Sequence, residues 1–139
     1  MRHRVVIPCG AKKADGPRRA GQFYLGSYHK QCLAWARSNF EEHEIAILSA
    51  RYGFVGLDRL LQPYEATFGR VLTNEQAALL RRTSLPVSRT ALVVGGKRYF
   101  EAAQSVLPRV QWLTPQMGLS KAGLGYQIQW LKNHRGFLP

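Results

Sequence analysis

The sequence predicts one α/β domain over residues 1–139, with helices on both sides of a central four-stranded, mostly parallel sheet (a three-layer α/β/α arrangement). Short apolar runs without polar alternation are typical of strands buried on both faces. Three times along the chain, such a run is followed by a stretch with helical periodicity. This alternation favours parallel strands joined by crossover helices.

The first half of the chain contains two predicted strands with a helix between them. The strands are residues 3–8 (HRVVIP) and 45–48 (IAIL). A helix over residues 22–40 is expected because apolar side chains recur there at helical spacing. This apolar face consists of Tyr24, Tyr28, Cys32, Trp35 and Ala36. His29 and Lys30 lie beside the apolar face, so we expect both to face solvent.

The segment after residue 50 has no clear period and is predicted to be a loop until Thr73. Thr73 and Gln76 then fit a capping box, which predicts a helix from there through about residue 82. Further elements are expected as a strand at 90–94, a helix at 97–106, a strand at 110–113, a loop at 114–120 and a helix at 121–134.

Charge is the strongest signal in the composition. Twenty Lys and Arg residues against eight Asp and Glu give a net charge of +12 and favour a polyanionic partner. Nucleic acid, and double-stranded DNA in particular, is the expected partner; the alternative is that the charge serves solubility alone. The candidate DNA-contacting residues are Arg18, Arg19, Arg51, Lys97, Arg98, Ser120 and Lys121.

The cysteine and histidine content gives no support to a disulfide framework or a metal site. There are two cysteines, and the four histidines are scattered. We therefore expect no cofactor. The chain has no apolar run of membrane-spanning length and no signal-peptide pattern, so we expect a cytoplasmic monomer with no membrane partner.

An unusual loop follows each predicted strand: PCGAKK, SARYGF, GGKRYF and TPQMGLSKAG. Because the carboxyl ends of parallel strands share one edge of a sheet, these loops are expected to form one site. The candidate substrate-binding residues are Cys9, Lys12, Lys13, Tyr24, Ser49, Tyr52, Gly53, Tyr64 and Gly96. Tyr24, Tyr52 and Tyr64 are expected to stack on a base or, alternatively, to pack in the core. Cys9 lacks a histidine partner in the sequence pattern, which favours a small buried residue over a nucleophile.

The order of PCGAKK, ILSARYGF, PYE, GG-x-x-Y and GLGYQIQWL resembles a family of small phage and bacterial proteins. That family is similar to the accessory domain of archaeosine synthase and to the peroxide-stress YaaA proteins, and more distantly to the uracil-DNA glycosylase superfamily. The resemblance covers nearly the whole chain. It implies a glycosylase-like fold and a base-flipping enzyme, with Met117 or Leu119 as the apolar wedge that fills the space of an extruded base. The alternative is that these two side chains pack a helix onto the sheet.

The resemblance does not supply a catalytic acid. Glycosylases of the superfamily place an Asp directly after the first strand, where this chain has Cys9. Base excision needs a group that stabilises positive charge on the sugar and orients water. The candidates are Asp58, which we favour slightly, Glu65 and Asp15. Lys12 or Lys13 is an alternative, as a Schiff-base nucleophile that would add strand cleavage.

Three functions follow from these expectations. The first is a DNA glycosylase-like hydrolase that acts on a base, which could be modified, in phage defence, DNA modification or repair. The second is a non-catalytic module that binds DNA or tRNA. An enzyme for free nucleotides is the third, and the positive charge argues against it because a small substrate needs no field of that size.

Overall fold

The computed structural model describes residues 3–84, 90–117 and 123–139, and within them a central sheet holds five strands in the order β4-β3-β1-β6-β7. The four predicted strands are present as β1 (Val5–Pro8), β3 (Ile45–Ser49), β6 (Ala91–Val93) and β7 (Val110–Trp112). These four strands run parallel to one another, which confirms a mostly parallel sheet.

The fifth strand, β4 (Gly53–Gly56), lies in the segment that the sequence predicted to be a loop, so that prediction was wrong there. β4 turns back antiparallel along β3 and forms one edge of the sheet. Gly53 makes the tight reversal possible, because its φ of 76° is in the left-handed region that side chains rarely adopt. A four-residue strand with a glycine at each end gives little periodicity to detect.

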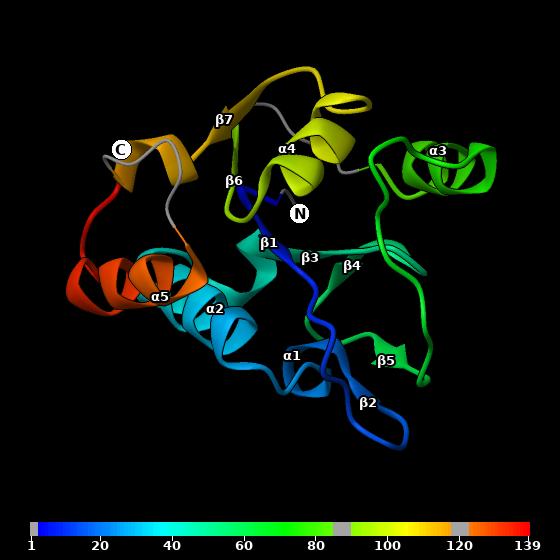
Figure 1. Cartoon of the computed structure of the whole chain (residues 1–139), viewed down its shortest axis with the longest axis horizontal. Coiled ribbons are helices and arrows are strands. Elements are labelled where there is room, and N and C mark those ends of the chain that lie inside the picture. Colours follow the sequence, from blue (N-terminus) through cyan, green and yellow to red (C-terminus); the bar gives the residue numbers. More distant parts are fainter. Residues whose placement is uncertain (1–2, 85–89, 118–122) are drawn as a thin grey trace.

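Helices lie on both faces of the sheet (Figure 1). One face is covered by α1 (Ala20–Phe23), α2 (Ser27–Asn39) and α5 (Leu124–Asn133), and the other by α3 (Asn74–Arg82) and α4 (Lys97–Gln104). Alternate residues of β1 belong to two separate hydrophobic clusters. Val5 and Ile7 belong to the cluster that includes Trp35 of α2, and Val6 belongs to the cluster that includes Leu80 of α3. Each face of the central strand therefore has its own core.

The predicted helix over residues 22–40 is two helices, and the chain between them is extended at Tyr24 and Gly26. Cys32 and Trp35 are fully buried, as the apolar spacing predicted. His29 was predicted to face solvent and is instead buried, with only 2% of its surface exposed. Its Nδ1 lies 2.7 Å from the carbonyl oxygen of Pro8, so the ring is held against the end of β1. Lys30 is exposed, as expected.

The capping box at α3 is confirmed. The Thr73 hydroxyl accepts a hydrogen bond from the Gln76 amide N–H at 3.0 Å, and the Gln76 side chain accepts one from the Thr73 N–H at 3.2 Å. These reciprocal bonds satisfy two donors that a helix start otherwise leaves unpaired. The predicted first residues of the last helix, from 121, lie partly outside the described residues.

Smaller elements complete the fold. β2 (Arg18–Arg19) and β5 (Leu60–Leu61) form a two-stranded antiparallel sheet, and the short helices η1 (Glu42–Glu44) and η2 (Thr114–Met117) lie before β3 and after β7. Within the described parts of the chain, no helix has the length and apolar character needed to cross a membrane.

Candidate functional site at the carboxyl ends of the strands

The loops that follow the parallel strands meet at one edge of the sheet, as the sequence predicted. β1 and β3 pair in register with Pro8 opposite Leu48, so Cys9 and Ser49 come next to each other where the strands end. β6 approaches β1 closely, because a Cβ on Gly95 would lie 3.1 Å from Pro8 Cγ. The Thr114 hydroxyl, after β7, donates to the Gly95 carbonyl oxygen at 2.6 Å.

Five polar side chains gather at this edge, and we call them the strand-end cluster: Cys9, Tyr24, Ser49, Tyr64 and Tyr99. The Tyr64 hydroxyl lies 2.6 Å from that of Tyr24 and 2.9 Å from that of Ser49. Cys9 Sγ lies 3.2 Å from the Tyr99 hydroxyl. These hydrogen bonds form two sets: one joins the loop after β1 to the first turn of α4, and the other joins the end of β3 and the end of α1 to the segment after β5.

Ser49 fixes the start of the loop after β3. Its hydroxyl oxygen accepts hydrogen bonds from the backbone N–H groups of Arg51 and Tyr52, at 3.2 and 3.0 Å. The Tyr52 ring then meets the Tyr64 ring edge-on at 5.6 Å between centroids. The fully buried Ser49 therefore contacts both members of this pair, through the backbone of Tyr52 and the hydroxyl of Tyr64.

The hydroxyl groups of the cluster stay neutral at physiological pH. Burial raises the pKa of Tyr24 to about 12. Burial also raises the pKa of Tyr64 and of Tyr99, and the nearby Cys9 thiol adds to the shift in both. Such groups can donate and accept hydrogen bonds to an uncharged ligand, but they carry no negative charge with which to stabilise a cationic transition state.

Cations surround the cluster. Lys13 Nζ lies 4.6 Å from the centroid of the Tyr64 ring, and the guanidinium groups of Arg51 and Arg59 lie 5.4 and 5.1 Å from that of Tyr52. At these distances a cation is attracted to the ring face. Lys12 is exposed on the same loop as Lys13. The surface at the strand ends is therefore aromatic and positively charged.

The three carboxylates predicted as catalytic lie on the surface. The Asp58 side chain is 97% exposed and pairs with Arg19 at 3.6 Å, and Asp15 and Glu65 are also exposed. Within the described residues, none of the three has a hydrogen bond or ion pair with a member of the strand-end cluster. The structure thus brings Cys9, Tyr24, Ser49 and Tyr64 to one edge of the sheet and leaves the predicted acids outside the cluster that they form.

The remaining predicted residues have varied surroundings. Gly96 is exposed at the start of α4, and Gly53 is buried at the start of β4. Lys97 pairs with Glu101, and an Arg98 N–H donates to the Phe68 carbonyl oxygen at 3.1 Å. Met117 is 3% exposed and belongs to the core on the α2 face, which matches the packing alternative for this side chain. Leu119, Ser120 and Lys121 lie outside the described residues.

Sequence reasoning missed two residues at this edge. Tyr99 lies in the first turn of α4 and contacts Cys9. Its position three residues after Gly96 could have indicated this, because the first turn of a helix that begins at a strand end lies beside the site. His29 had no such signal. Its burial follows from the break between α1 and α2, which turns the first residues of α2 toward β1.

No group of three or more potential metal ligands occurs in the parts of the chain that the structure describes. Cys9 and Cys32 are both buried with free thiols. The chemistry that this edge offers is therefore hydrogen bonding by neutral hydroxyl and thiol groups, stacking by tyrosine rings, and attraction of anions by lysine and arginine.

Comparison with known proteins gives a family and one relative. A family model described as "Family of unknown function (DUF6884)" matches residues 5–133. The chain is also similar to an uncharacterized protein, YfjM, of Bacillus subtilis (strain 168). The two are 31% identical over 141 aligned positions, which cover 93% of this chain and 92% of that protein.

Proposed function

Because this chain belongs to the DUF6884 family, whose function is unknown, we propose its function from the site itself: it binds nucleic acid at the carboxyl ends of the strands. Phosphates of a DNA backbone contact the cations around the strand-end cluster, and one base is accommodated by the tyrosines. The observation that carries the proposal is the combination of a net charge of +12 with lysine and arginine set over tyrosine rings at this edge.

Two kinds of contact support this function. Attraction between phosphates and cations supplies most of the affinity for nucleic acid irrespective of sequence. Stacking of bases on aromatic side chains adds about 1–3 kcal/mol per base and tolerates any base. Lys13 with Tyr64, and Arg51 with Tyr52, provide both kinds side by side.

Binding of a short DNA duplex, followed by fluorescence anisotropy, tests the proposal. The variant Lys12→Gln/Arg51→Gln removes two cations that follow β1 and β3. Its matched control, Arg4→Gln/Arg109→Gln, removes two exposed cations that precede β1 and β7, at the opposite ends of strands. We expect at least about tenfold weaker binding for the first variant and little change for the second. Equal losses in both would mean that the charge attracts DNA diffusely, and the proposed surface would be wrong.

Base excision is the second candidate function, and the position of Lys13 favours it. Lys13 is half-buried and its amine lies 4.6 Å from the centroid of the Tyr64 ring at the cluster, which is where a Schiff-base nucleophile would meet a flipped base and its sugar. The proposal in this form includes a glycosylase-like three-layer arrangement of the helices and sheet. Double-stranded DNA with ordinary, uracil-containing or hypermodified bases is the substrate to test, with release of free base as the readout.

Two further measurements separate the possible catalytic groups. Borohydride would trap a covalent protein–DNA adduct through Lys13, and Lys13→Gln would abolish the adduct. Asp58→Asn/Glu65→Gln would abolish base release only if a carboxylate is catalytic. Should no substrate release a base while the duplex still binds, the protein is a binding module and the enzymatic form of the proposal fails.

A further inference from the structure

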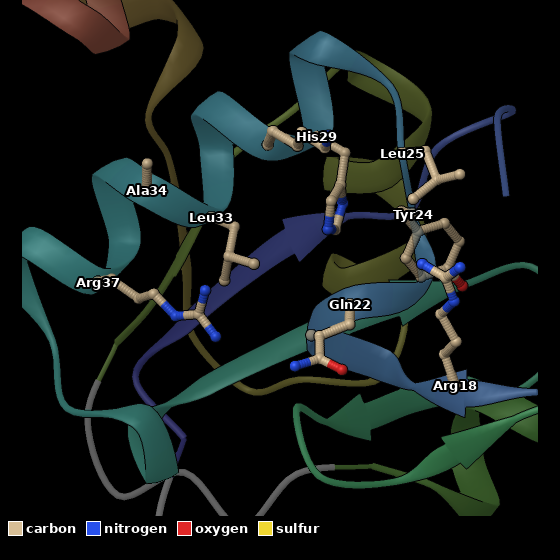
Figure 2. A pocket seen from close by; sticks show the side chains of 10 residues that line it. Arg18, Gln22, Tyr24, Leu25, His29, Leu33, Ala34 and Arg37 are labelled. Carbon is tan, nitrogen blue, oxygen red and sulfur yellow. The ribbon is translucent and has the colours of Figure 1, made fainter. Parts of the chain in front are cut away.

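A cavity lies between α1 and α2, and its lining includes Arg18 of β2 and Tyr24 of the strand-end cluster. It has a volume of about 420 Å³. Small-molecule sites in proteins usually enclose roughly 300–1,000 Å³, so the cavity has the size of a ligand site. Figure 2 shows that its walls come from separate segments: Arg18 from β2, Gln22 and Tyr24 from α1 and its end, and His29 and Leu33 from α2.

The charge of this cavity favours an anion. Its lining includes Arg18, Lys30 and Arg37, and none of its lining residues is acidic. Arg37 is already paired with Glu42, at 2.8 Å from Nε to the carboxylate. Arg18 forms no ion pair within the part of the chain that the structure describes. Lys30 has no ion pair in these residues either, but of the two only Arg18 has the planar guanidinium that binds a phosphate through two N–H groups, so Arg18 is the better match for a phosphate.

One buried atom at the wall of the cavity needs a hydrogen-bond donor. His29 is 2% exposed, and its Nε2 has no hydrogen-bond partner among the described residues. Since Nδ1 lies 2.7 Å from a carbonyl oxygen, which only accepts, Nδ1 carries the proton of the neutral ring and Nε2 keeps a lone pair. A buried acceptor without a donor is destabilising, and a ligand N–H at this position would remove that cost. Because Nε2 is itself buried, the side chains that cover it must move for a ligand to reach it.

Much of the remaining wall is apolar or aromatic. The Tyr24 ring lies 4.9 Å from the His29 ring, and Leu25 and Leu33 complete this side. His29 and Leu33 point from α2 toward α1 (Figure 2), and Gln22 of α1 also lines the cavity. A planar heterocycle with N–H groups suits these neighbours, because its faces meet apolar carbon and its edge meets an imidazole lone pair and an amide.

We propose that the cavity between α1 and α2 binds a nucleoside monophosphate, with the phosphate on Arg18 and a base N–H donated to His29 Nε2. The proposal does not depend on binding of nucleic acid by the strand-end cluster. The nucleotide could be free or could form the 5′-phosphorylated end of a chain, since both present the same phosphate, sugar and base.

Isothermal titration calorimetry with the four ribonucleoside 5′-monophosphates tests the proposal. We expect binding of at least one of them, and at least about tenfold weaker binding of the matching nucleoside and of inorganic phosphate, because each lacks half of the contacts. The same titration with a 5′-phosphorylated and an unphosphorylated oligonucleotide distinguishes a chain end from a free nucleotide. Equal affinity for inorganic phosphate and all four nucleotides would overturn the proposal, since the cavity would then select charge alone.

Two neighbouring arginines provide a matched pair of variants. Arg18 lines the cavity, whereas Arg19, the next residue of β2, pairs with Asp58 and is absent from the lining. We expect Arg18→Gln to weaken nucleotide binding about tenfold or more and Arg19→Gln to leave it unchanged. Equal losses in both variants would overturn the assignment. Duplex binding by the Lys12→Gln/Arg51→Gln variant reports separately on the strand-end surface.

His29→Asn tests the base contact. Asparagine keeps an N–H donor for the Pro8 carbonyl oxygen but removes the lone pair of Nε2. We expect affinities for the four nucleotides to become more alike, while inorganic phosphate binds as before. Unchanged discrimination would remove His29 from the proposal. If this variant does not fold, the comparison of Arg18→Gln with Arg19→Gln still decides whether the cavity holds the phosphate.

Discussion

At the scale of single residues, His29 makes the stability of the protein depend on pH. Burial lowers its pKa from 6.5 to about 4 in the folded protein. Between pH 6.5 and pH 4, the imidazole of His29 is therefore protonated in the unfolded chain but not in the folded protein. The contribution of His29 to the free energy of unfolding is thus fully present above about pH 6.5 and is lost as the pH falls toward 4. Between pH 7 and pH 5 we expect the free energy of unfolding to drop by about 2 kcal/mol from this group.

Urea unfolding of the wild type and of His29→Asn at both pH values measures this contribution. Between pH 7 and pH 5, the free energy of unfolding of the variant should fall by about 2 kcal/mol less than that of the wild type. His3 acts in the same direction, because burial lowers its pKa too, but it is present in both proteins and cancels in the difference. A parallel loss in the two proteins would contradict a neutral, buried His29.

At the scale of elements, the turn between β3 and β4 depends on Gly53. A Cβ here would clash with the Thr83 hydroxyl oxygen, which accepts from the Phe54 N–H at 3.1 Å and donates to the Leu79 carbonyl oxygen at 2.8 Å. This hydroxyl connects the start of β4 to the end of α3. Gly53→Ala also incurs the backbone strain of a positive φ, so we expect a loss of about 2 kcal/mol or more in the free energy of unfolding.

Gly16→Ala is the matched control for this substitution, because Gly16 has no positive φ and a Cβ there meets nothing within 4 Å. Its free energy of unfolding should stay within about 0.5 kcal/mol of the wild type. Thermal or urea unfolding of both variants makes the comparison. Similar stabilities for the two variants would show that the hairpin tolerates a side chain at Gly53.

Some helices and strands could be predicted from local sequence patterns, and others could not. The start of α3 was predictable because the capping box of Thr73 and Gln76 is formed within four residues of chain. β1 and β3 were predictable because fully buried strands leave continuous apolar runs. β4 was not, since its short GFVG sequence becomes a strand only by pairing with β3. Contacts of this kind between segments are not encoded in any local spacing.

At the scale of the whole molecule, the net charge of +12 predicts steep salt dependence of nucleic-acid binding. Each phosphate that a cation neutralises contributes about −0.9 to the slope of log K against log salt concentration for duplex DNA. Lys12→Gln/Arg51→Gln should therefore reduce the magnitude of the slope by nearly 2, and Arg4→Gln/Arg109→Gln should leave it unchanged. Anisotropy titrations at several salt concentrations measure both slopes, and an unaltered slope in the first variant would exclude direct phosphate contacts by its two cations.

The location of the candidate site was predictable at this scale, but its chemistry was not. Parallel strands place their carboxyl ends together, so Cys9, Ser49 and the loop of Gly95 were expected to meet and they do. Which side chains turn inward depends on how the segments after β5 and β6 return to the sheet. Those paths bring the Tyr64 and Tyr99 hydroxyls to the cluster and leave Asp58 on the surface, a distinction that no residue spacing expresses.

The burial of Cys32 allows opening of the folded protein to be followed by alkylation of a native thiol. Its thiol is fully enclosed beneath α2, and burial raises its pKa to about 12, so in the folded protein it is both inaccessible to alkylating reagents and protonated. In a Cys9→Ala background, each alkylated molecule would be one that had opened far enough to expose the core on the α2 face. When reclosing is faster than alkylation, the rate of modification would thus give the free energy of this opening under native conditions, at dilutions too low for calorimetry.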